Sequence, residues 1–156
     1  MNRRENPMDG QRFFNDMFLI KRRYDQFCKP LLLRHDLRQS DLDVLLCLAS
    51  NPNCRTAGEV SECRLIPKSQ VSSSVDALTR KGLLMGEVDP QDRRRVLLTL
   101  LPPARQIIDE AFLLSDAYFQ QMLSGTSDED LRTLDRVSTQ LISNLNSGNG
   151  AASTPL

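Results

Sequence analysis

Apolar residues recur at helical spacing along most of the chain, and this pattern predicts a mostly helical fold. Over residues 11–34 they return every three or four positions, as in a long amphipathic helix. Pro30 should kink this helix or end it early, because proline lacks the amide hydrogen that a helix interior needs. A second helix is expected over residues 40–49, with Ser40 as its cap. The first third of the chain therefore predicts two packed helices.

The next segment has the pattern of a helix-turn-helix. Thr56 and Glu59 have the spacing of a capping box, so a short helix should begin there and end near Arg64. Leu65 and Ile66 would form the turn. A second helix is expected over residues 67–81, since proline is well tolerated at the first position of a helix. One face of this helix is apolar, and the other is rich in serine.

A hairpin with a cationic tip is predicted directly after this helix. Gly82 suits the left-handed position that ends a helix. Strands are expected over 83–88 and 95–101, joined by a type I turn at residues 89–92. The tip carries three consecutive arginines: Arg93, Arg94 and Arg95. A hairpin beside a recognition helix forms a wing, and the two together can reach two grooves of a DNA duplex.

The C-terminal third predicts two more amphipathic helices, over about 103–123 and 127–146, with Ser124-Gly125-Thr126 between them. We expect no further domain on which they could pack. Their apolar stripes are therefore expected to pack on another subunit. Residues 147–156 contain too few bulky apolar side chains to fold and are expected to be disordered.

The formal net charge is zero, but the charge is unevenly distributed. Residues 1–63 carry +1, residues 64–105 carry +4, and residues 106–156 carry −5. The positive excess coincides with the helix-turn-helix and the wing, which is the electrostatic pattern of a DNA reader. No apolar run is long enough for a membrane span, and no apolar segment follows the basic N-terminus as in a secretory signal. We expect a cytoplasmic protein.

Two sequence elements at this spacing resemble the MarR (multiple antibiotic resistance regulator) family of winged helix-turn-helix proteins: Leu78-x3-Gly82-Leu83 and Asp89-Pro90-x-Asp92-Arg93-Arg94. The resemblance implies a mostly α fold with a small β-wing and with N- and C-terminal dimerisation helices. It implies a single domain over 11–146, with a DNA-binding lobe at about 37–101 and dimerisation helices at about 11–34 and 103–146. It also implies a homodimer on a palindromic operator, released by small phenolic ligands or by oxidants.

Candidate DNA contacts lie on the second helix of the motif and on the wing. Hydrogen-bonding side chains near the start of a recognition helix meet base edges and phosphates, and here they are Lys68, Ser69, Gln70, Ser72 and Ser73. Similar proteins often have an arginine at the position of Ser73. On the wing, the candidates are Arg93, Arg94 and Arg95, of which we expect one to enter the minor groove, and Asp92 is expected to brace the turn.

The four cysteines form no metal-binding pattern, and the single histidine leaves little to build a metal site from. Cys28 is the candidate for redox sensing, because basic side chains lie near it in the sequence. Cys47 and Cys63 are expected in the core, and Cys54 in an exposed loop. No nucleophile–base arrangement and no phosphate-binding loop is recognisable, so an enzyme is not expected, nor is a cofactor.

The sequence therefore predicts a DNA-binding transcriptional regulator, most simply a homodimeric repressor. A second hypothesis stays open. A winged-helix protein that has lost sequence-specific DNA binding could serve as a protein-interaction module, which the zero net charge, Ser73 and the proline-rich junction Leu101-Pro102-Pro103 would allow.

Overall fold

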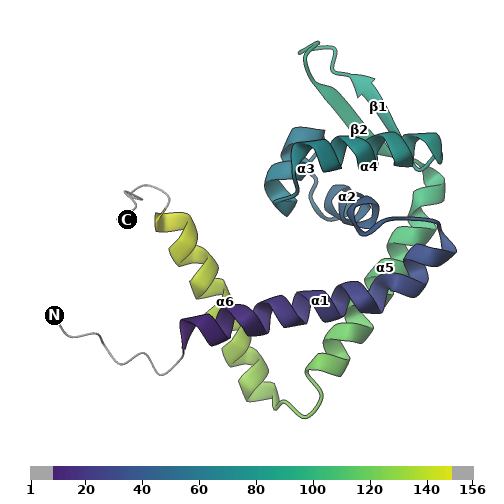
Figure 1. The fold of residues 1–156 in the computed structure, drawn as a ribbon. Coiled ribbons are helices and arrows are strands. Elements are labelled where there is room, and N and C mark those ends of the chain that lie inside the picture. Colours follow the sequence, from purple (N-terminus) through teal and green to yellow (C-terminus); the bar gives the residue numbers. More distant parts are fainter. Residues whose placement is uncertain (1–8, 149–156) are drawn as a thin grey trace. The chain divides into compact units, whose positions relative to one another are not determined.

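The computed structural model describes residues 9–148 and confirms the predicted fold class, mostly helical with a two-stranded wing (Figure 1). The elements follow one another in this order: α1 (Gly10–Arg34), α2 (Gln39–Ser50), α3 (Ala57–Arg64), α4 (Lys68–Arg80), β1 (Leu84–Val88), β2 (Val96–Leu100), α5 (Pro102–Met122) and α6 (Asp128–Gly148). No helix among the described residues is long and apolar enough to cross a membrane.

The chain forms two compact units, the first ending at Tyr118 and the second beginning at Phe119. Within the first unit, α2, α3, α4, β1 and β2 make up a structure that we call the lobe. Its core is completed by the end of α1 and the first half of α5. The largest fully buried apolar side chains come from α1, α2, α3, α4 and β1: Leu31, Leu42, Val44, Leu45, Val60, Val71, Leu78 and Leu84.

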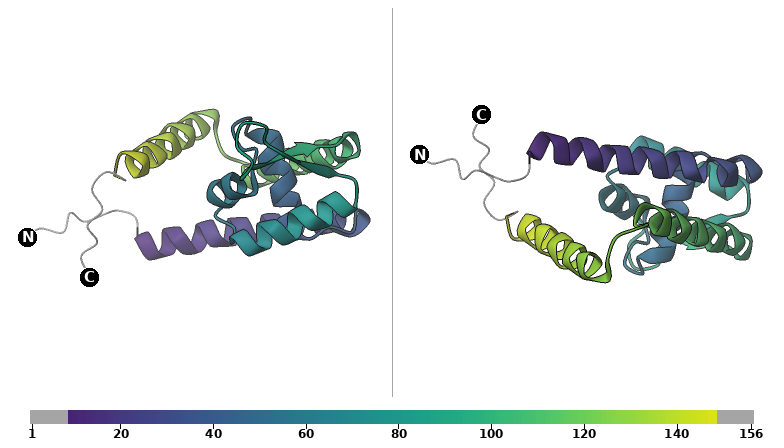
Figure 2. Two further views of the ribbon diagram at one scale, coloured as in Figure 1. Left: turned by 90° about the horizontal axis from the view of Figure 1, so that it is seen from above. Right: turned by 90° about the horizontal axis from the view of Figure 1, so that it is seen from below.

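Polar and aromatic contacts fix α1 beside α5, as the two further views also show (Figure 2). The hydroxyl groups of Tyr24 and Ser115 lie 2.7 Å apart, and the Tyr118 hydroxyl donates a hydrogen bond of 2.9 Å to the carbonyl of Ile20. The ring of Tyr118 also lies 5.5 Å, centre to centre, from the rings of Tyr24 and Phe27. These contacts support α5 at the point where it leaves the lobe.

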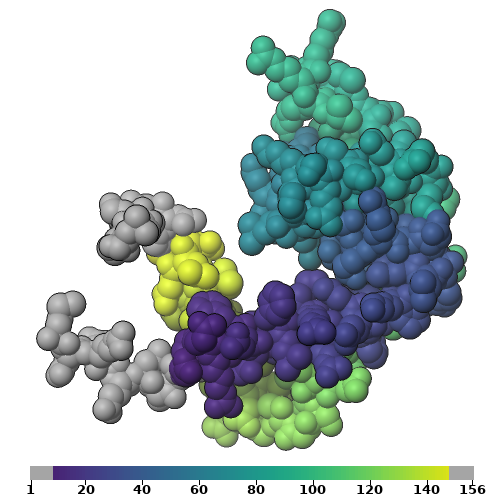
Figure 3. All heavy atoms as spheres, viewed as in Figure 1, coloured from purple at the N-terminus to yellow at the C-terminus, as the bar shows by residue number. Residues whose placement is uncertain are grey.

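The wing is an antiparallel hairpin held to the lobe at its base. Leu84 pairs with Leu100 at the base and Val88 with Val96 toward the tip. On the other side of β2, the amide of Leu98 donates a hydrogen bond of 2.7 Å to the carbonyl of Arg55, just before α3. The wing is therefore tied through its backbone to the start of the helix-turn-helix. In the space-filling view its tip stands out as a narrow projection from the lobe (Figure 3).

Several boundaries differ from the sequence prediction. α1 continues through Pro30 to Arg34, so the proline does not end it early. Ser40 does not cap α2: Arg38 is the N-cap residue, and Ser40 is buried inside the helix. Its hydroxyl accepts a hydrogen bond from Ser74 of α4, a partner that no local sequence rule reveals.

The second unit consists of the end of α5, a turn and α6. Gly125 has a φ of +84°, a conformation that favours glycine. Ser127 caps α6 as predicted, since its hydroxyl oxygen accepts from the amide of Asp130 at 3.2 Å. α6 runs to Gly148, beyond the predicted limit of 146. The rest of the predicted disordered tail, residues 149–156, lies outside the described residues.

Candidate DNA-binding surface

The direction of α4 is set by the capped helix and tight turn that precede it. The Thr56 hydroxyl oxygen accepts from the amide of Glu59 at 3.3 Å, and the Glu59 carboxylate accepts from the amide of Thr56 at 2.9 Å, which confirms the predicted capping box. Leu65 then takes a left-handed conformation with φ of +53°. The Ser61 hydroxyl closes this turn by donating a hydrogen bond of 2.7 Å to the carbonyl of Ile66.

α4 has one buried face and one polar, exposed face. Val71, Ser74 and Leu78 are buried. All five side chains predicted to contact DNA on this helix are exposed: Lys68, Ser69, Gln70, Ser72 and Ser73. The helix begins at Lys68, one residue later than predicted, and Pro67 is its N-cap residue rather than its first residue. Within the described part of the chain, no acceptor binds the amides of Lys68 and Ser69, which leaves both free for an anion at this helix terminus.

The wing turn lies three residues later than predicted. Its hydrogen bond joins the amide of Arg95 to the carbonyl of Asp92 at 2.9 Å, so Arg93 and Arg94 occupy the centre of the turn rather than follow it. The Asp92 carboxylate accepts from the amide of Arg94 at 3.0 Å. The composition of residues 89–92 predicts a type I turn there, but the strand register from Leu84 to Val88 leaves seven residues between the strands.

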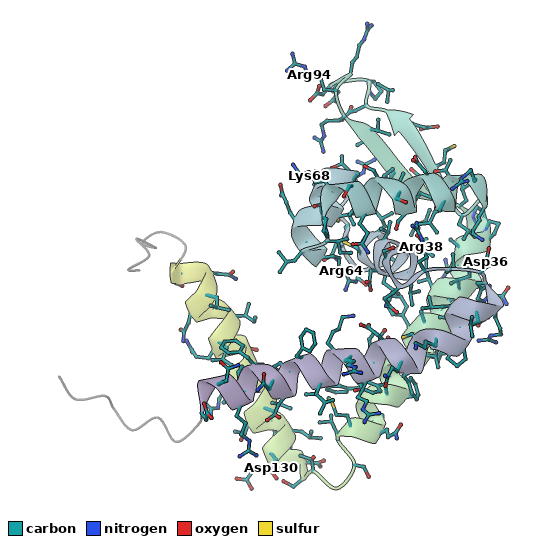
Figure 4. The ribbon with its side chains drawn as sticks, in the orientation of Figure 1. Asp36, Arg38, Arg64, Lys68, Arg94 and Asp130 are labelled. Atoms are coloured by element: carbon teal, nitrogen blue, oxygen red, sulfur yellow. The ribbon has the colours of Figure 1, made fainter. Side chains whose placement is uncertain are left out.

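The three arginines of the wing separate into two groups. Arg95 turns back toward the lobe, where its guanidinium lies 2.9 Å from the Glu59 carboxylate at the start of α3. Arg93 and Arg94 are exposed at the tip and form no ion pair with any described residue. Figure 4 shows Arg94 at the far end of the hairpin and Lys68 at the start of α4. The tip therefore presents two free guanidinium groups.

Glu59 has a second role beside its contact with Arg95. Its other carboxylate oxygen accepts from the amides of Arg55, at 2.7 Å, and Thr56, at 2.9 Å. These backbone hydrogen bonds, that of Arg55 first, hold the pKa of Glu59 below its ordinary value, and the Arg95 guanidinium adds to this effect. The same carboxylate thus caps α3 and anchors the base of the wing.

The cysteines are arranged differently from the sequence prediction. Cys54 is buried, not exposed, and its sulfur lies 3.3 Å from that of Cys47 in the core. Burial is the largest cause that raises the pKa of Cys54, to about 12. Cys63 is exposed rather than buried. Cys28 is buried, and burial raises the pKa of its thiol too, which disfavours the thiolate. No cluster of three or more metal-binding side chains occurs within residues 9–148.

Comparisons with known proteins agree with this architecture. Residues 35–95, which hold the helix-turn-helix and most of the wing, match the model of the MarR family. An uncharacterised HTH-type transcriptional regulator of Staphylococcus aureus is 28% identical over 102 residues, which cover 65% of this chain and 69% of that protein. YsmB of Bacillus subtilis, also an uncharacterised HTH-type regulator, is 28% identical over 81 residues, covering 52% and 56% of the two chains.

Solved structures show the same fold. A MarR transcriptional regulator from Methanosarcina mazei has a TM-score of 0.78 at 12% identity, with 88% of this chain and 98% of that chain covered. Staphylococcus aureus MarR, solved with salicylate and kanamycin, has a TM-score of 0.72 at 24% identity, with 88% and 92% covered. The family consists of transcription regulators and not of enzymes. The solved structures show the fold, and the match of residues 35–95 with the similarity to curated HTH-type regulators identifies the chain as a member of the MarR family of DNA-binding winged helix-turn-helix transcriptional regulators.

Proposed function

We propose that the protein is a cytoplasmic homodimeric repressor that binds a palindromic operator. The observation that carries the proposal is the exposed polar face of α4 beside a wing whose tip presents Arg93 and Arg94 (Figure 4). In a major groove, Gln70 would pair with adenine and the serines would contact bases or phosphates. A guanidinium of the wing would enter the minor groove, where the negative potential is strongest. In this proposal Asp92 braces the turn, and Arg95 braces the wing rather than contacting DNA.

Exposed apolar side chains support the homodimer. α1 exposes Phe14 and Phe18, and α6 exposes a stripe along its length, although helices of this length normally bury one face. The α6 stripe comprises Leu134, Val137, Leu141, Ile142 and Leu145. A two-fold dimer would cover these faces and place two recognition helices about one helical turn of DNA apart, which is why we expect a palindrome. Repression would follow where the operator overlaps a promoter.

A hollow beside the start of α5 supports release by a small ligand. It measures about 540 Å³, which suits a small aromatic molecule. Its lining includes part of the proline-rich junction and two charged groups, Arg105 and Asp109. The other lining residues are apolar: Ala49, Leu100, Leu101, Pro102, Ile108 and Phe112. Arg105 could bind a carboxylate or phenolate. Among proteins of the same fold, one was solved with salicylate and another has its DNA binding regulated by 6-hydroxynicotinic acid.

Release by oxidants through Cys28 stays a prediction. Its burial and raised pKa predict slow reaction with peroxide. If Cys28 is the sensor, Cys28→Ser should abolish oxidant-induced release from DNA. Unchanged release in this variant would show that the residue only fills the core.

The proposal is tested by selecting bound sequences from a random pool of DNA duplexes. We expect two inverted half-sites whose centres lie about 10 base pairs apart. Gel-shift titration of the DNA upstream of the protein's own gene, followed by a transcription reporter, would then separate repression from activation. An interaction module without sequence-specific DNA binding, the alternative function, would select no common sequence and bind all duplexes equally.

A further inference from the structure

An arginine outside the helix-turn-helix reaches the exposed face of α4. Arg38 is the N-cap residue of α2, and its side chain remains 52% exposed. One terminal nitrogen of its guanidinium, Nη1, donates a hydrogen bond of 3.1 Å to the hydroxyl of Ser73 on α4. Figure 4 shows Arg38 close to α2 and α4. The guanidinium is therefore held against the recognition helix by a residue that is 35 positions away in the sequence.

The guanidinium is fixed by a buried carboxylate. Asp41 is only 2% exposed, and its two oxygens accept from Arg38 Nε at 3.2 Å and from Nη2 at 2.8 Å. The Asp41 carboxylate also accepts from the backbone amide of Arg38 at 2.9 Å. Burial alone would raise the pKa of Asp41, but the hydrogen bonds from Arg38 outweigh burial and lower it. Both groups thus stay charged at neutral pH, in a two-point geometry that lysine could not reproduce.

A second hydrogen bond behind the ion pair fixes α4 relative to α2. The hydroxyl of Ser74 donates to that of Ser40 at 2.9 Å, and both residues are buried. Ser73 and Ser74 are neighbours, so one peptide unit of α4 is held twice by the first turn of α2. The position of the guanidinium on α4 is therefore preorganised rather than one conformer of a free side chain.

The guanidinium still has donors to offer. It carries five N–H groups. Three of them, one each on Nε, Nη1 and Nη2, donate hydrogen bonds of 3.2 Å or less to the residues described here. The remaining Nη2 hydrogen has only a long contact of 3.5 Å with Ser74. The second Nη1 hydrogen has no partner among the described residues, and a phosphate oxygen is a suitable acceptor for it.

The surroundings identify the acceptor. Ser73 lies on the same helical face as Ser69 and Gln70, four and three residues earlier. Between Lys68 and Arg80, α4 has no cationic side chain of its own. We propose that Arg38 is a DNA-backbone contact that supplies the middle of the recognition helix with a cation, held in place by Asp41, Ser73 and the Ser40–Ser74 hydrogen bond. This inference rests on the proposed binding of DNA through α4.

The test must avoid leaving a buried, unpaired carboxylate, which would destabilise the fold whatever Arg38 does. We therefore compare D41N with R38A/D41N in the full-length chain. Binding to a duplex of random sequence and to a selected operator is measured by fluorescence anisotropy at several salt concentrations. Arg34→Ala is the matched control, because this substitution also removes one positive charge. Arg34 is likewise exposed and forms an ion pair, with Glu110 at 2.9 Å.

We expect R38A/D41N to bind both duplexes about tenfold more weakly than D41N, since a charge-assisted hydrogen bond to phosphate is lost. The slope of log K against log salt should fall by about 0.9 per protomer, the value for one phosphate contact. R38K in the D41N background should keep most of the slope, and Arg34→Ala should change neither affinity nor slope. Melting temperatures of D41N and R38A/D41N should agree within a few degrees.

Equal affinity and equal slope for D41N and R38A/D41N would overturn the proposal and leave Arg38 a purely structural residue. A lower affinity of R38A/D41N with an unchanged slope of log K against log salt would also overturn the proposal. If R38A/D41N does not fold, the comparison of R38K/D41N with R38Q/D41N gives the same slope test. Failure of the proposed function has a different result: the unmodified protein would bind no duplex, whereas failure of the Arg38 contact leaves that binding intact.

Discussion

The lobe and α6 differ in the burial of their apolar side chains. The lobe buries most of its leucines and valines within one chain, and Leu42, Leu45 and Leu78 have no exposed surface at all. Among residues 128–147, α6 has no buried residue, and Leu134, Leu141 and Leu145 are between 44% and 68% exposed. The core of the lobe is therefore closed within one chain, with the end of α1 and the first half of α5, whereas the stripe of α6 predicts a surface for assembly. The two regions should respond differently to the same kind of substitution.

The largest effect is expected from charges in the α6 stripe. Leu141→Glu/Leu145→Glu should raise the dissociation constant of the homodimer at least about a hundredfold, because an unpaired carboxylate in an apolar interface costs several kcal/mol. Analytical ultracentrifugation measures this directly. Thr139→Glu/Ser143→Glu is the matched control, with the same charges at the same spacing on the opposite side of the helix. Equal dissociation of both variants would show that net charge matters and the stripe does not.

Within the lobe, the corresponding change should cost stability rather than assembly. Leu78→Ala should lower the free energy of unfolding by about 2–5 kcal/mol, since it opens a cavity in a closed core. Leu65→Ala makes the same chemical change at a side chain that is 89% exposed and should cost less than about 0.5 kcal/mol. Urea titration of both variants measures the difference. Similar losses would mean that burial of Leu78 in the core contributes no more to stability than an exposed leucine does.

Local sequence rules predicted the elements of the lobe because each depends on neighbouring residues. Helical periodicity located α1 to α6, and the capping box of Thr56 and Glu59 is formed as predicted. Gly82, with φ of +67°, ends the recognition helix as expected. In each case the residues that determine the structure lie within four positions of one another, so a short stretch of sequence contains the information.

The errors concern contacts between distant segments. Ser40 was predicted to cap α2, but its partner is Ser74, 34 residues later. Arg95 was grouped with the tip arginines, yet it pairs with Glu59, 36 residues earlier. Cys54 looked exposed in a loop, but the core encloses it beside Cys47. No local sequence rule identifies Arg38 as a site residue, because only the packing of α2 against α4 brings it to the recognition face.

The ion pair of Arg38 with the buried Asp41 makes the stability of the lobe depend on pH. The pKa of Asp41 is lowered from its ordinary value of 3.8 in the folded protein. The ion pair therefore contributes stability that is fully present above pH 3.8 and is lost as the pH falls through the folded-state pKa. D41N should be less stable than the unmodified protein at pH 7, and this difference should shrink below pH 3.8. Unfolding free energies measured from pH 7 to pH 3 provide the check.

The control for this pH dependence is a partly exposed carboxylate with a lowered pKa. A hydrogen bond from Gln106 is the largest cause that lowers the pKa of Glu110, and His35 and Arg34 add to it. Because the Glu110 side chain is 26% exposed, against 2% for Asp41, Glu110→Gln should change the pH profile much less than D41N. Equal changes would mean that the buried Asp41 pair is no more important to the lobe than a surface pair.

A small effect on stability is expected at the base of the wing, and it separates Arg95 from its two neighbours. The Arg95–Glu59 pair is partly exposed, so Arg95→Ala should cost at most about 1 kcal/mol of stability. Arg95 faces α3, and its loss should leave the salt dependence of DNA binding nearly unchanged. Arg93→Ala/Arg94→Ala should leave stability unchanged but reduce the salt slope by up to about 1.8 per protomer, if each guanidinium neutralises one phosphate. Thermal melts and salt titrations of both variants measure these two quantities separately. A slope that falls as much for Arg95→Ala would mean that the ion pair opens on DNA and that all three arginines contact the duplex.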